Sequence, residues 1–197
     1  MLVLSPSVAT SPDVTHSALV LTRKRYRGNL SFAGRLRTVR QLRTGSAPNP
    51  WECGWIVWNY QDAGHFYYLA VKPNGWELGK RDPVYPGGQR FLASGHAEYA
   101  IGGWHRFLVT QEGNRVTLHV NGNKVASFND TERPYKEGNL GFYTEDAEIE
   151  ISGTTAPFAE NFNDYPPQTI KADGSVMRKW TVPFLGYGYA AIDDRKK

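Results

Sequence analysis

The fold is decided by the stretch Trp104–Ile151, which reads WHRFLVTQEGNRVTLHVNGNKVASFNDTERPYKEGNLGFYTEDAEIEI. Its first half alternates apolar and polar residues with a period of two, as strands with one buried face do. The apolar positions are Phe107, Val109, Val116, Leu118 and Val120. Gly113-Asn114 separates the two predicted strands and Asn121-Gly122 follows the second, and both residue types tolerate the positive φ of tight turns. The stretch therefore predicts an antiparallel β-meander, and helical spacing is absent.

The same period continues on either side of the acidic turn Glu145-Asp146. Leu140 and Phe142 precede the turn, and Ile149 and Ile151 follow it. The 197 residues include 20 Gly and 12 Pro, scattered among short strands, and 13% are aromatic. This composition favours an all-β, two-sheet antiparallel β-sandwich of the jelly-roll type over any helical fold. We expect residues 1–197 to form a single domain.

Charge and hydropathy narrow the classes of partner. The formal net charge of +4 and the pI of about 9.1 favour acidic partners such as uronate-containing glycans. Basic residues cluster in segments 23–27 and 35–43, but no nucleic-acid-binding motif accompanies them, so we expect no nucleic-acid partner. No apolar stretch reaches the length of a membrane span. The single Cys53 is expected to be a small, buried core residue.

Four segments together resemble the concanavalin A-like lectin/glucanase superfamily, in particular its laminin-G-like and family-16-glycosidase-like domains: Arg35–Arg43, Trp51–Gln61, His65–Arg81 and Trp104–Ile151. The resemblance implies two antiparallel sheets, a concave face that holds a glycan and often a structural calcium ion. It therefore implies binding of a polysaccharide or oligosaccharide, and we expect the protein to be a monomer. It also implies an extracellular or periplasmic location, although Met1–Pro6 lacks the features of a signal peptide.

Residues 154–197 resemble the opening of such a domain, although they come last in this chain. They contain the acidic-aromatic stretch Phe158–Phe162, a strand that begins at Trp180, and the Gly-Tyr-Gly strand Gly186–Ile192. We expect Met1–Ser5 to pair with Tyr187–Ile192. A circular permutation is the simplest hypothesis, since sandwich termini commonly lie close together. The alternatives are a plain C-terminal extension or the opening of a truncated second repeat.

The candidate glycan groove lies in the aromatic-rich region 51–81. Ile56, Trp58 and Tyr60 are expected on one side of a strand and Trp55, Val57 and Asn59 on the other, and the pattern leaves open which side faces the core. Aromatic rings stack on sugar rings, and charged side chains bind hydroxyl groups. With two cations from segment 35–43, the predicted ligand-binding residues are Arg37, Arg40, Trp58, Tyr60, His65, Tyr67, Trp76, Glu77, Lys80 and Arg81.

A polysaccharide-degrading enzyme, either a glycoside hydrolase or a polysaccharide lyase, is the alternative function. Retaining hydrolysis needs two carboxyl groups about 5–5.5 Å apart. Glu148 and Glu150 share a strand face, but Glu145–Glu150 does not match the Glu-x-Asp-x-x-Glu pattern of family 16. Jelly-roll lyases use Arg, Gln-x-His and Tyr, and this chain has those residue types without the contiguous motifs. The catalytic candidates are Glu77, His65, Tyr67, Glu148 and Glu150.

Calcium is the one metal that the resemblance implies. Glu160, Asn161, Asp164 and Glu148 would supply the hard oxygen ligands that calcium prefers. The C-terminal segment and the strand around residue 148 would have to meet for this site to form. Protein binding by a laminin-G-like adhesion or scaffold domain is a third possible function, and no specific residue indicates it.

Overall fold

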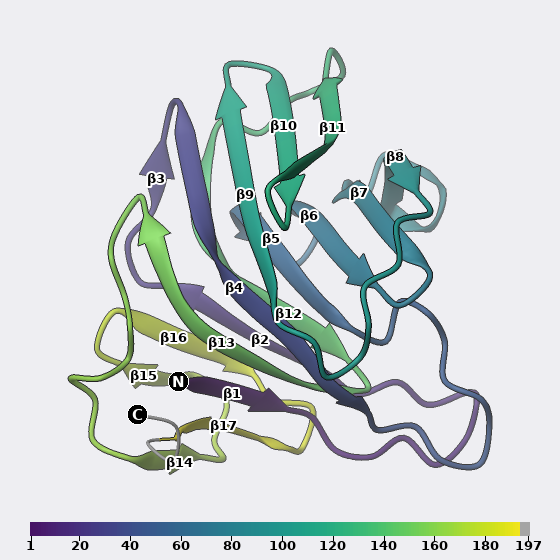
Figure 1. The fold of residues 1–197 in the computed structure, drawn as a ribbon, viewed down its shortest axis with the longest axis vertical. Helices are drawn as coiled ribbons and strands as arrows, with labels where there is room; N and C mark the ends of the chain where they lie inside the picture. The colour runs from purple at the N-terminus through teal and green to yellow at the C-terminus, as the bar shows by residue number, and fades with distance from the viewer. Residues whose placement is uncertain (194–197) are drawn as a thin grey trace.

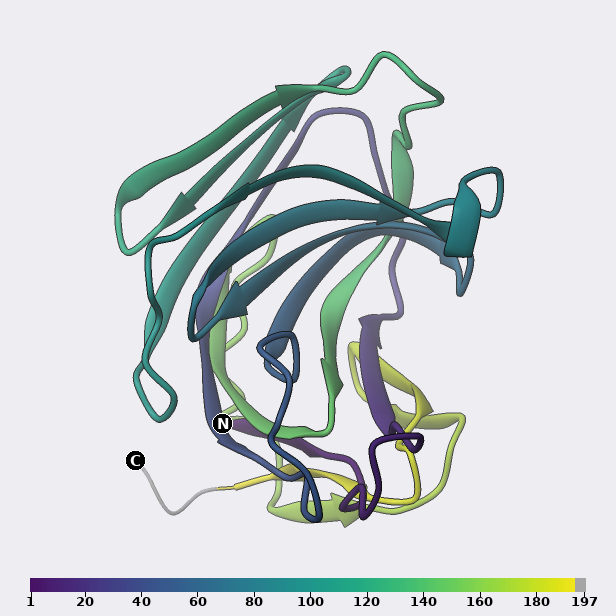
Figure 2. The ribbon, with the colours of Figure 1, turned by 90° about the vertical axis from the view of Figure 1, so that its right-hand side faces the viewer.

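The computed structural model describes residues 1–193, which fold into two stacked antiparallel β-sheets (Figure 1), both strongly curved (Figure 2). The predicted two-sheet β-sandwich is confirmed. Sheet A consists, in spatial order, of β11 (Asn123–Asn129), β10 (Arg115–Val120), β9 (His105–Glu112), β4 (Leu30–Gln41), β13 (Ala147–Ala156), β1 (Leu2–Ser5), β17 (Tyr189–Ile192) and β14 (Gln168–Ile170). Sheet B consists of β15 (Ser175–Met177), β16 (Trp180–Phe184), β2 (Ser17–Thr22), β12 (Glu137–Glu145), β5 (Gly54–Asp62), β6 (His65–Lys72), β7 (Gly75–Arg81) and β8 (Gln89–Gly95), with β3 (Tyr26–Arg27) also paired with β12.

The main core lies between the two sheets. Its largest fully buried side chains include Trp58 and Phe142 of sheet B and Phe32 of sheet A, and the ring of Phe32 contacts that of Phe142 at 5.7 Å between centroids. Trp58 also donates a hydrogen bond from its indole to Gln111 of β9, at 3.0 Å. This bond shows that the side of β5 bearing Trp58 faces sheet A.

The predicted meander is present in sheet A. Strands β9 and β10 pair with Val120 opposite Phe107, and β10 pairs with β11. The chain then crosses to sheet B, where β12 lies between β2 and β5. The acidic turn brings it back, because β13 pairs with β4 and β1 in sheet A. Glu145-Asp146 is thus the corner at which the chain passes from one sheet to the other.

The two ends of the described chain meet in sheet A. Strand β1 pairs with β17, with Leu2 opposite Ile192 and Ser5 opposite Tyr189, which confirms the predicted pairing. The backbone N–H of Asp193 donates to the carbonyl of Met1 at 3.0 Å. The connection proposed through the last residues falls on 194–197, outside the described residues, so circular permutation stays a prediction. Among residues 1–193, no helix has the length and apolarity needed to cross a membrane.

A backbone irregularity in β5 makes one part of the face prediction wrong. Asn59 adopts a left-handed φ of 48°, and the pairing of β5 with β6 and β12 shifts at this point. Asn59 therefore turns its side chain inward, where it donates to Gln111 at 3.0 Å. Trp58 and Tyr60 consequently lie on opposite faces of the sheet, whereas strict alternation predicts the same face.

Cys53 is fully buried, as predicted, and burial raises the pKa of its thiol well above the ordinary value. We expect the native protein to be inert toward an aromatic disulfide reagent, because the thiolate is the reactive species. Absorbance of the released chromophore should report one thiol only after denaturation. Rapid reaction of the native protein would show that the packing around this residue opens.

Candidate functional site

A second apolar cluster covers the face of sheet B that is turned away from sheet A. Because side chains alternate along a strand, Trp55 and Val57, which flank the core residue Ile56, point outward. The members of this outer cluster are Leu19, Leu21, Cys53, Trp55, Val57, Phe66, Tyr68 and Ala70, with Tyr60, Tyr143 and Phe184 packed against them. The outer face of the sheet is therefore as aromatic as its inner face.

A cleft of about 260 Å³ opens in this outer face. Several of its aromatic rings contact one another. The rings of Trp55 and Tyr143 lie 5.2 Å apart in an edge-to-face arrangement, and those of Tyr60 and Phe66 stack at 5.3 Å. The lining residues are Leu19, Trp55, Val57, Tyr60, Ala63, Phe66, Arg81, Gln89, Tyr143, Glu145 and Phe184.

The cleft holds a carboxylate with perturbed acidity. Glu145 stands at the corner between the sheets, and the hydroxyl group of Tyr143 donates to its carboxylate at 2.6 Å. Burial raises the pKa of Glu145 above the ordinary value, and the hydrogen bond from Tyr143 and the charge of Arg81 offset part of this rise. Burial likewise raises the pKa of Tyr143 well above its ordinary value. The cleft thus combines rings, a cation and a proton-binding group.

Tyr68 forms a polar platform on the same face beside the cleft. Its ring lies over Gly79 on the neighbouring strand, where a Cβ would stand 2.2 Å from the Tyr68 hydroxyl oxygen. That hydroxyl donates to Glu77 at 2.8 Å, and Lys72 pairs with Glu77 at 3.1 Å. Gln89 of β8 donates in turn to the Tyr68 hydroxyl. Glycine at position 79 is therefore required for the ring to lie flat on the sheet.

The structure brings together only some of the predicted ligand-binding residues. Tyr60 and Arg81 line the cleft, and Glu77 lies in the adjoining polar platform. Trp58, Tyr67 and Trp76 belong to the main core instead, and Lys80 is fully buried. The inward face of sheet B carries these four side chains, so they do not line the cleft.

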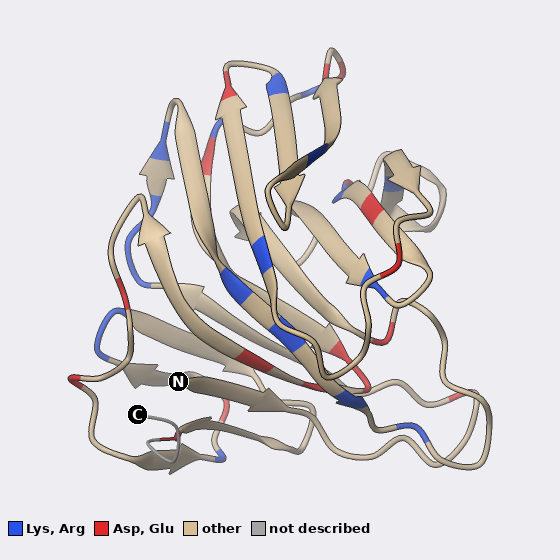
Figure 3. Ribbon diagram, in the orientation of Figure 1, with Lys and Arg blue, Asp and Glu red and all other residues tan. Residues whose placement is uncertain are grey.

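The other predicted residues lie elsewhere on the molecule. Arg37 and Arg40 of β4 form ion pairs with Glu150 and Glu148 of β13 in sheet A, where acidic and basic positions lie on neighbouring strands (Figure 3). Both glutamates line a different cleft of about 780 Å³ on that sheet. His65 contacts Asp62 at 2.8 Å in the turn between β5 and β6. These residues do not share a site with the cleft in sheet B.

His65 and Tyr67 do not form the predicted acid–base pair. The Tyr67 hydroxyl donates to Asp130, and burial followed by this hydrogen bond raises the pKa of Tyr67 far above its ordinary value. The His65 ring is held by Asp62 instead. Tyr67 is thus a buried core residue whose hydroxyl group is occupied by Asp130.

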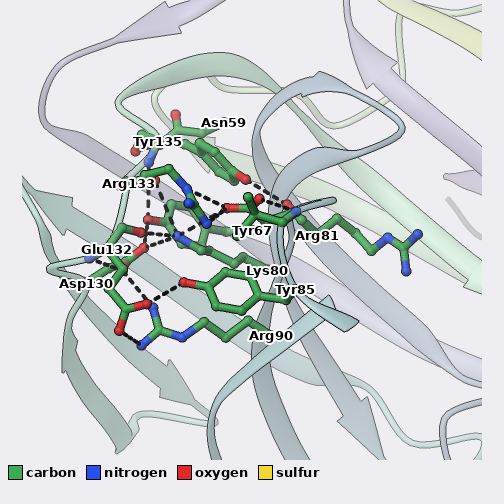
Figure 4. A network of polar contacts seen from close by, with 12 residues as sticks. Asn59, Tyr67, Lys80, Arg81, Tyr85, Arg90, Asp130, Glu132, Arg133 and Tyr135 are labelled. Atoms are coloured by element: carbon green, nitrogen blue, oxygen red, sulfur yellow. Dashed lines mark hydrogen bonds and ion pairs between the residues drawn. The ribbon is translucent and has the colours of Figure 1, made fainter. Parts of the chain in front are cut away.

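Lys80 belongs to a buried polar network (Figure 4). Its ammonium group contacts the Asp130 carboxylate at 2.8 Å and donates to the carbonyl groups of Glu132 and Arg133. Tyr67 and Arg90 also donate to Asp130, at 2.5 and 3.3 Å. The network fastens the loop between β11 and β12 to strands β6, β7 and β8.

The predicted calcium ligands do not assemble. Glu160 accepts hydrogen bonds from the Phe162 N–H at 2.9 Å and the Tyr165 hydroxyl at 2.8 Å. Its bridge partner Thr154 lies six residues from Glu148 in β13, about 20 Å along an extended strand. Within residues 1–193, no three His, Cys, Asp or Glu side chains are grouped to hold a metal ion. These residues therefore do not fit the implied calcium ion.

Sequence reasoning missed most of the cleft. Trp55 and Val57 were expected on the side of their strand opposite Trp58, and the bond between Trp58 and Gln111 identifies that side as outward. Leu19 and Phe184 come from segments distant in sequence, for which no local signal was available.

A family model described as the 3-keto-alpha-glucoside-1,2-lyase-like domain matches residues 42–152. The chain belongs to this family. The matched segment includes β5 to β12 and every cleft residue except Leu19 and Phe184. A search of curated proteins found no match.

Solved structures share the sandwich fold at low sequence identity. The carbohydrate-binding module CBM66 from Bacillus subtilis is 13% identical with a TM-score of 0.57, over 76% of this chain and 89% of that chain. The chicken liver agglutinin CG-16 is 11% identical with a TM-score of 0.49, over 70% of this chain and 98% of that chain. At these identities the likeness concerns the fold alone.

Proposed function

We propose that the cleft in the outer face of sheet B binds carbohydrate, with a polysaccharide or oligosaccharide as the ligand. The single observation that carries this proposal is the gathering of aromatic rings around an open cleft that also presents Arg81, Gln89 and Glu145. Sugar rings have apolar faces that stack on aromatic side chains, and their hydroxyl groups form hydrogen bonds to charged and amide groups. Both kinds of contact are available within one cleft.

The comparisons support the same class of ligand. The family to which the chain belongs is named for a glucoside, and the matched segment includes most of the cleft. The structure with a TM-score of 0.57 is named as a carbohydrate-binding module. Each sheet of a sandwich has one face turned away from the other sheet, and in sheet B that face carries the cleft.

We expect Tyr60→Ala to weaken binding of a neutral oligosaccharide by about 5- to 30-fold. The Tyr60 ring is half-buried and stacks on Phe66 at the cleft wall, so its removal deletes stacking area while the rest of the wall stays. A loss of about 1–2 kcal/mol is typical of an aromatic contact of this size. Calorimetric titration with a panel of neutral oligosaccharides measures the change.

His65→Ala is the matched control, because His65, the first residue of β6, pairs with Asp62 and does not line the cleft. Its affinity for the same oligosaccharides should equal that of the wild type. Equal weakening by both variants, or unchanged affinity of the Tyr60 variant with an intact fold, would remove the cleft as the binding site.

One observation favours processing of the bound sugar as a second function. Glu145 has a raised pKa, lies in the cleft and accepts a hydrogen bond from Tyr143. General bases work best when their pKa approaches the operating pH, and burial moves a carboxylate in that direction. We propose Glu145 as the base of a 1,2-elimination from a 3-keto glucoside, the chemistry for which the family is named.

The atoms of this elimination balance without an oxidant or a metal ion. The Glu145 carboxylate removes the proton from C2, which is acidic because C2 lies next to the C3 carbonyl. The electron pair forms a double bond between C1 and C2, the bond from C1 to the glycosidic oxygen breaks, and the departing oxygen takes a proton from water. The expected product is an unsaturated ketone.

A further inference from the structure

A basic cleft of about 530 Å³ lies at one end of the sandwich, apart from the cleft in sheet B. The turn between β15 and β16 meets the connection from β2 to β3 there, and both loops carry basic residues on one side of the molecule (Figure 3). The backbone N–H of Arg23 donates to the carbonyl of Lys179 at 2.7 Å, which fixes the two loops together. The lining residues are Thr22, Arg23, Lys24, Tyr26, Pro157, Phe158, Arg178 and Lys179.

Three of the four cations in this basic cleft have no carboxylate partner among residues 1–193. Only Lys179 has an ion pair, at 3.6 Å to Glu160. Arg23 donates to the carbonyl of Arg178, while Lys24 lies over the ring of Tyr26 at 5.3 Å. All four residues are exposed. Gathering like charges in one cleft is unfavourable unless an anion neutralises them.

The backbone holds one of these cations in a strained conformation. Arg178 is the first central residue of the two-residue turn that joins the paired residues Met177 and Trp180, and its φ is +47°. Glycine is the usual residue where the first central position of such a turn has positive φ. An arginine in this position is disfavoured by about 1 kcal/mol or more, and strain of this kind concentrates at functional sites.

Aromatic rings form another wall of the basic cleft. Tyr26 and Phe158 stack at 6.0 Å between centroids with an interplanar angle of 17°, and both are half-buried. Rings and unpaired guanidinium groups in one cleft match a ligand that has both apolar ring faces and an anionic group. We infer that the basic cleft is a second binding site, for a saccharide that carries a carboxylate or a sulfate ester.

A sugar fits these observations better than a nucleic acid does. The cations occupy one short cleft, whereas nucleic-acid surfaces extend a basic stripe along the phosphate backbone. The basic cleft shares no lining residue with the cleft in sheet B, so loss of binding at one cleft leaves binding at the other unaffected.

The test is affinity electrophoresis in gels that contain polygalacturonate, dextran sulfate or neutral dextran. The wild type should be retarded by one or both polyanions and not by dextran, and retardation should fall with added salt because exposed charges are screened. Arg23→Ala/Lys24→Ala should weaken retardation by about tenfold or more, as expected for loss of charge-assisted hydrogen bonds. Whether polygalacturonate or dextran sulfate binds more tightly identifies the anionic group.

The variant Arg178→Gly distinguishes weaker binding caused by a lost charge from weaker binding caused by a damaged fold. Glycine relieves the strain at φ +47°, so this variant should melt about 2 °C higher than the wild type and still bind the polyanion several-fold more weakly. Lys124→Ala removes one exposed cation from β11 as a matched control and should leave retardation unchanged.

Three outcomes would overturn the inference. They are no retardation of the wild type by either polyanion at low salt, equal weakening by Lys124→Ala, and equally strong binding of double-stranded DNA. Binding of neutral oligosaccharides should persist in the Arg23→Ala/Lys24→Ala variant, since those residues lie outside the cleft in sheet B.

Discussion

Replacement of Lys80 by Met should destabilise the protein by about 3–5 kcal/mol, the range typical of breaking a buried ion pair from one side. Both partners, Lys80 and Asp130, are fully buried. The methionine leaves the Asp130 carboxylate without its ammonium partner, and it leaves the carbonyl groups of Glu132 and Arg133 without their donor. Urea unfolding followed by tryptophan fluorescence measures the change.

Lys124→Met is the matched control, because this lysine is exposed on β11 and has no role in the core. It should change the free energy of unfolding by no more than about 0.5 kcal/mol. If the Lys80 variant stays within about 1 kcal/mol of the control, the loop from β11 to β12 is held by other contacts.

We expect the same buried network to make the free energy of unfolding depend on pH in the acidic range. Burial alone would raise the pKa of Asp130, but hydrogen bonds from Lys80 and Tyr67 outweigh it and lower this pKa below the ordinary value. The stabilisation is therefore present above the unfolded-state pKa and is lost as the pH falls through the lower folded-state pKa. In the Lys80 variant, this acid-dependent part of the unfolding free energy should shrink.

The strands of this fold could be predicted because their signal is local. Alternation at Phe107, Val109 and Val116 is sufficient to locate β9 and β10, since one face of each is buried along its whole length. The pairing of Met1–Ser5 with the last strand could also be predicted, because both segments alternate and sandwich ends meet.

The site could be predicted only in part, because alternation does not say which face of a strand is buried. Trp58 and Trp55 are equally apolar, and only the contact with Gln111 from the other sheet assigns Trp58 to the core. The bulge at Asn59 then moved Tyr60 to the cleft. Lys80 was assigned to the surface because a lysine is expected there unless it is paired. Its buried partner Asp130 is 50 residues away, so no local signal revealed the pair.

Glu145→Gln should abolish most of any turnover of a 3-keto glucoside, with a fall in kcat of about 10²- to 10⁴-fold, the usual contribution of a general base. The amide keeps the shape of the side chain and cannot accept the C2 proton. Binding of a neutral oligosaccharide should change little, because the stacking rings of the cleft remain in place. Absorbance of the unsaturated ketone product measures the rate.

The pH profile distinguishes a base from a residue that only supports the fold. Wild-type kcat/KM should fall as the pH falls through the raised pKa of Glu145, because only the carboxylate accepts a proton. Tyr143→Phe removes a hydrogen bond that lowers this pKa, so the acid limb of the profile should move to higher pH.

Glu148→Gln is the matched control for the elimination, since Glu148 lies on sheet A and pairs with Arg40. Its kcat should equal that of the wild type, and a loss as large as that of the Glu145 variant would move the chemistry to sheet A, where Glu148 and Glu150 line their own cleft. Absence of turnover by the wild type would reject elimination and leave sugar binding in the cleft as the function, because the stacking rings act without the base.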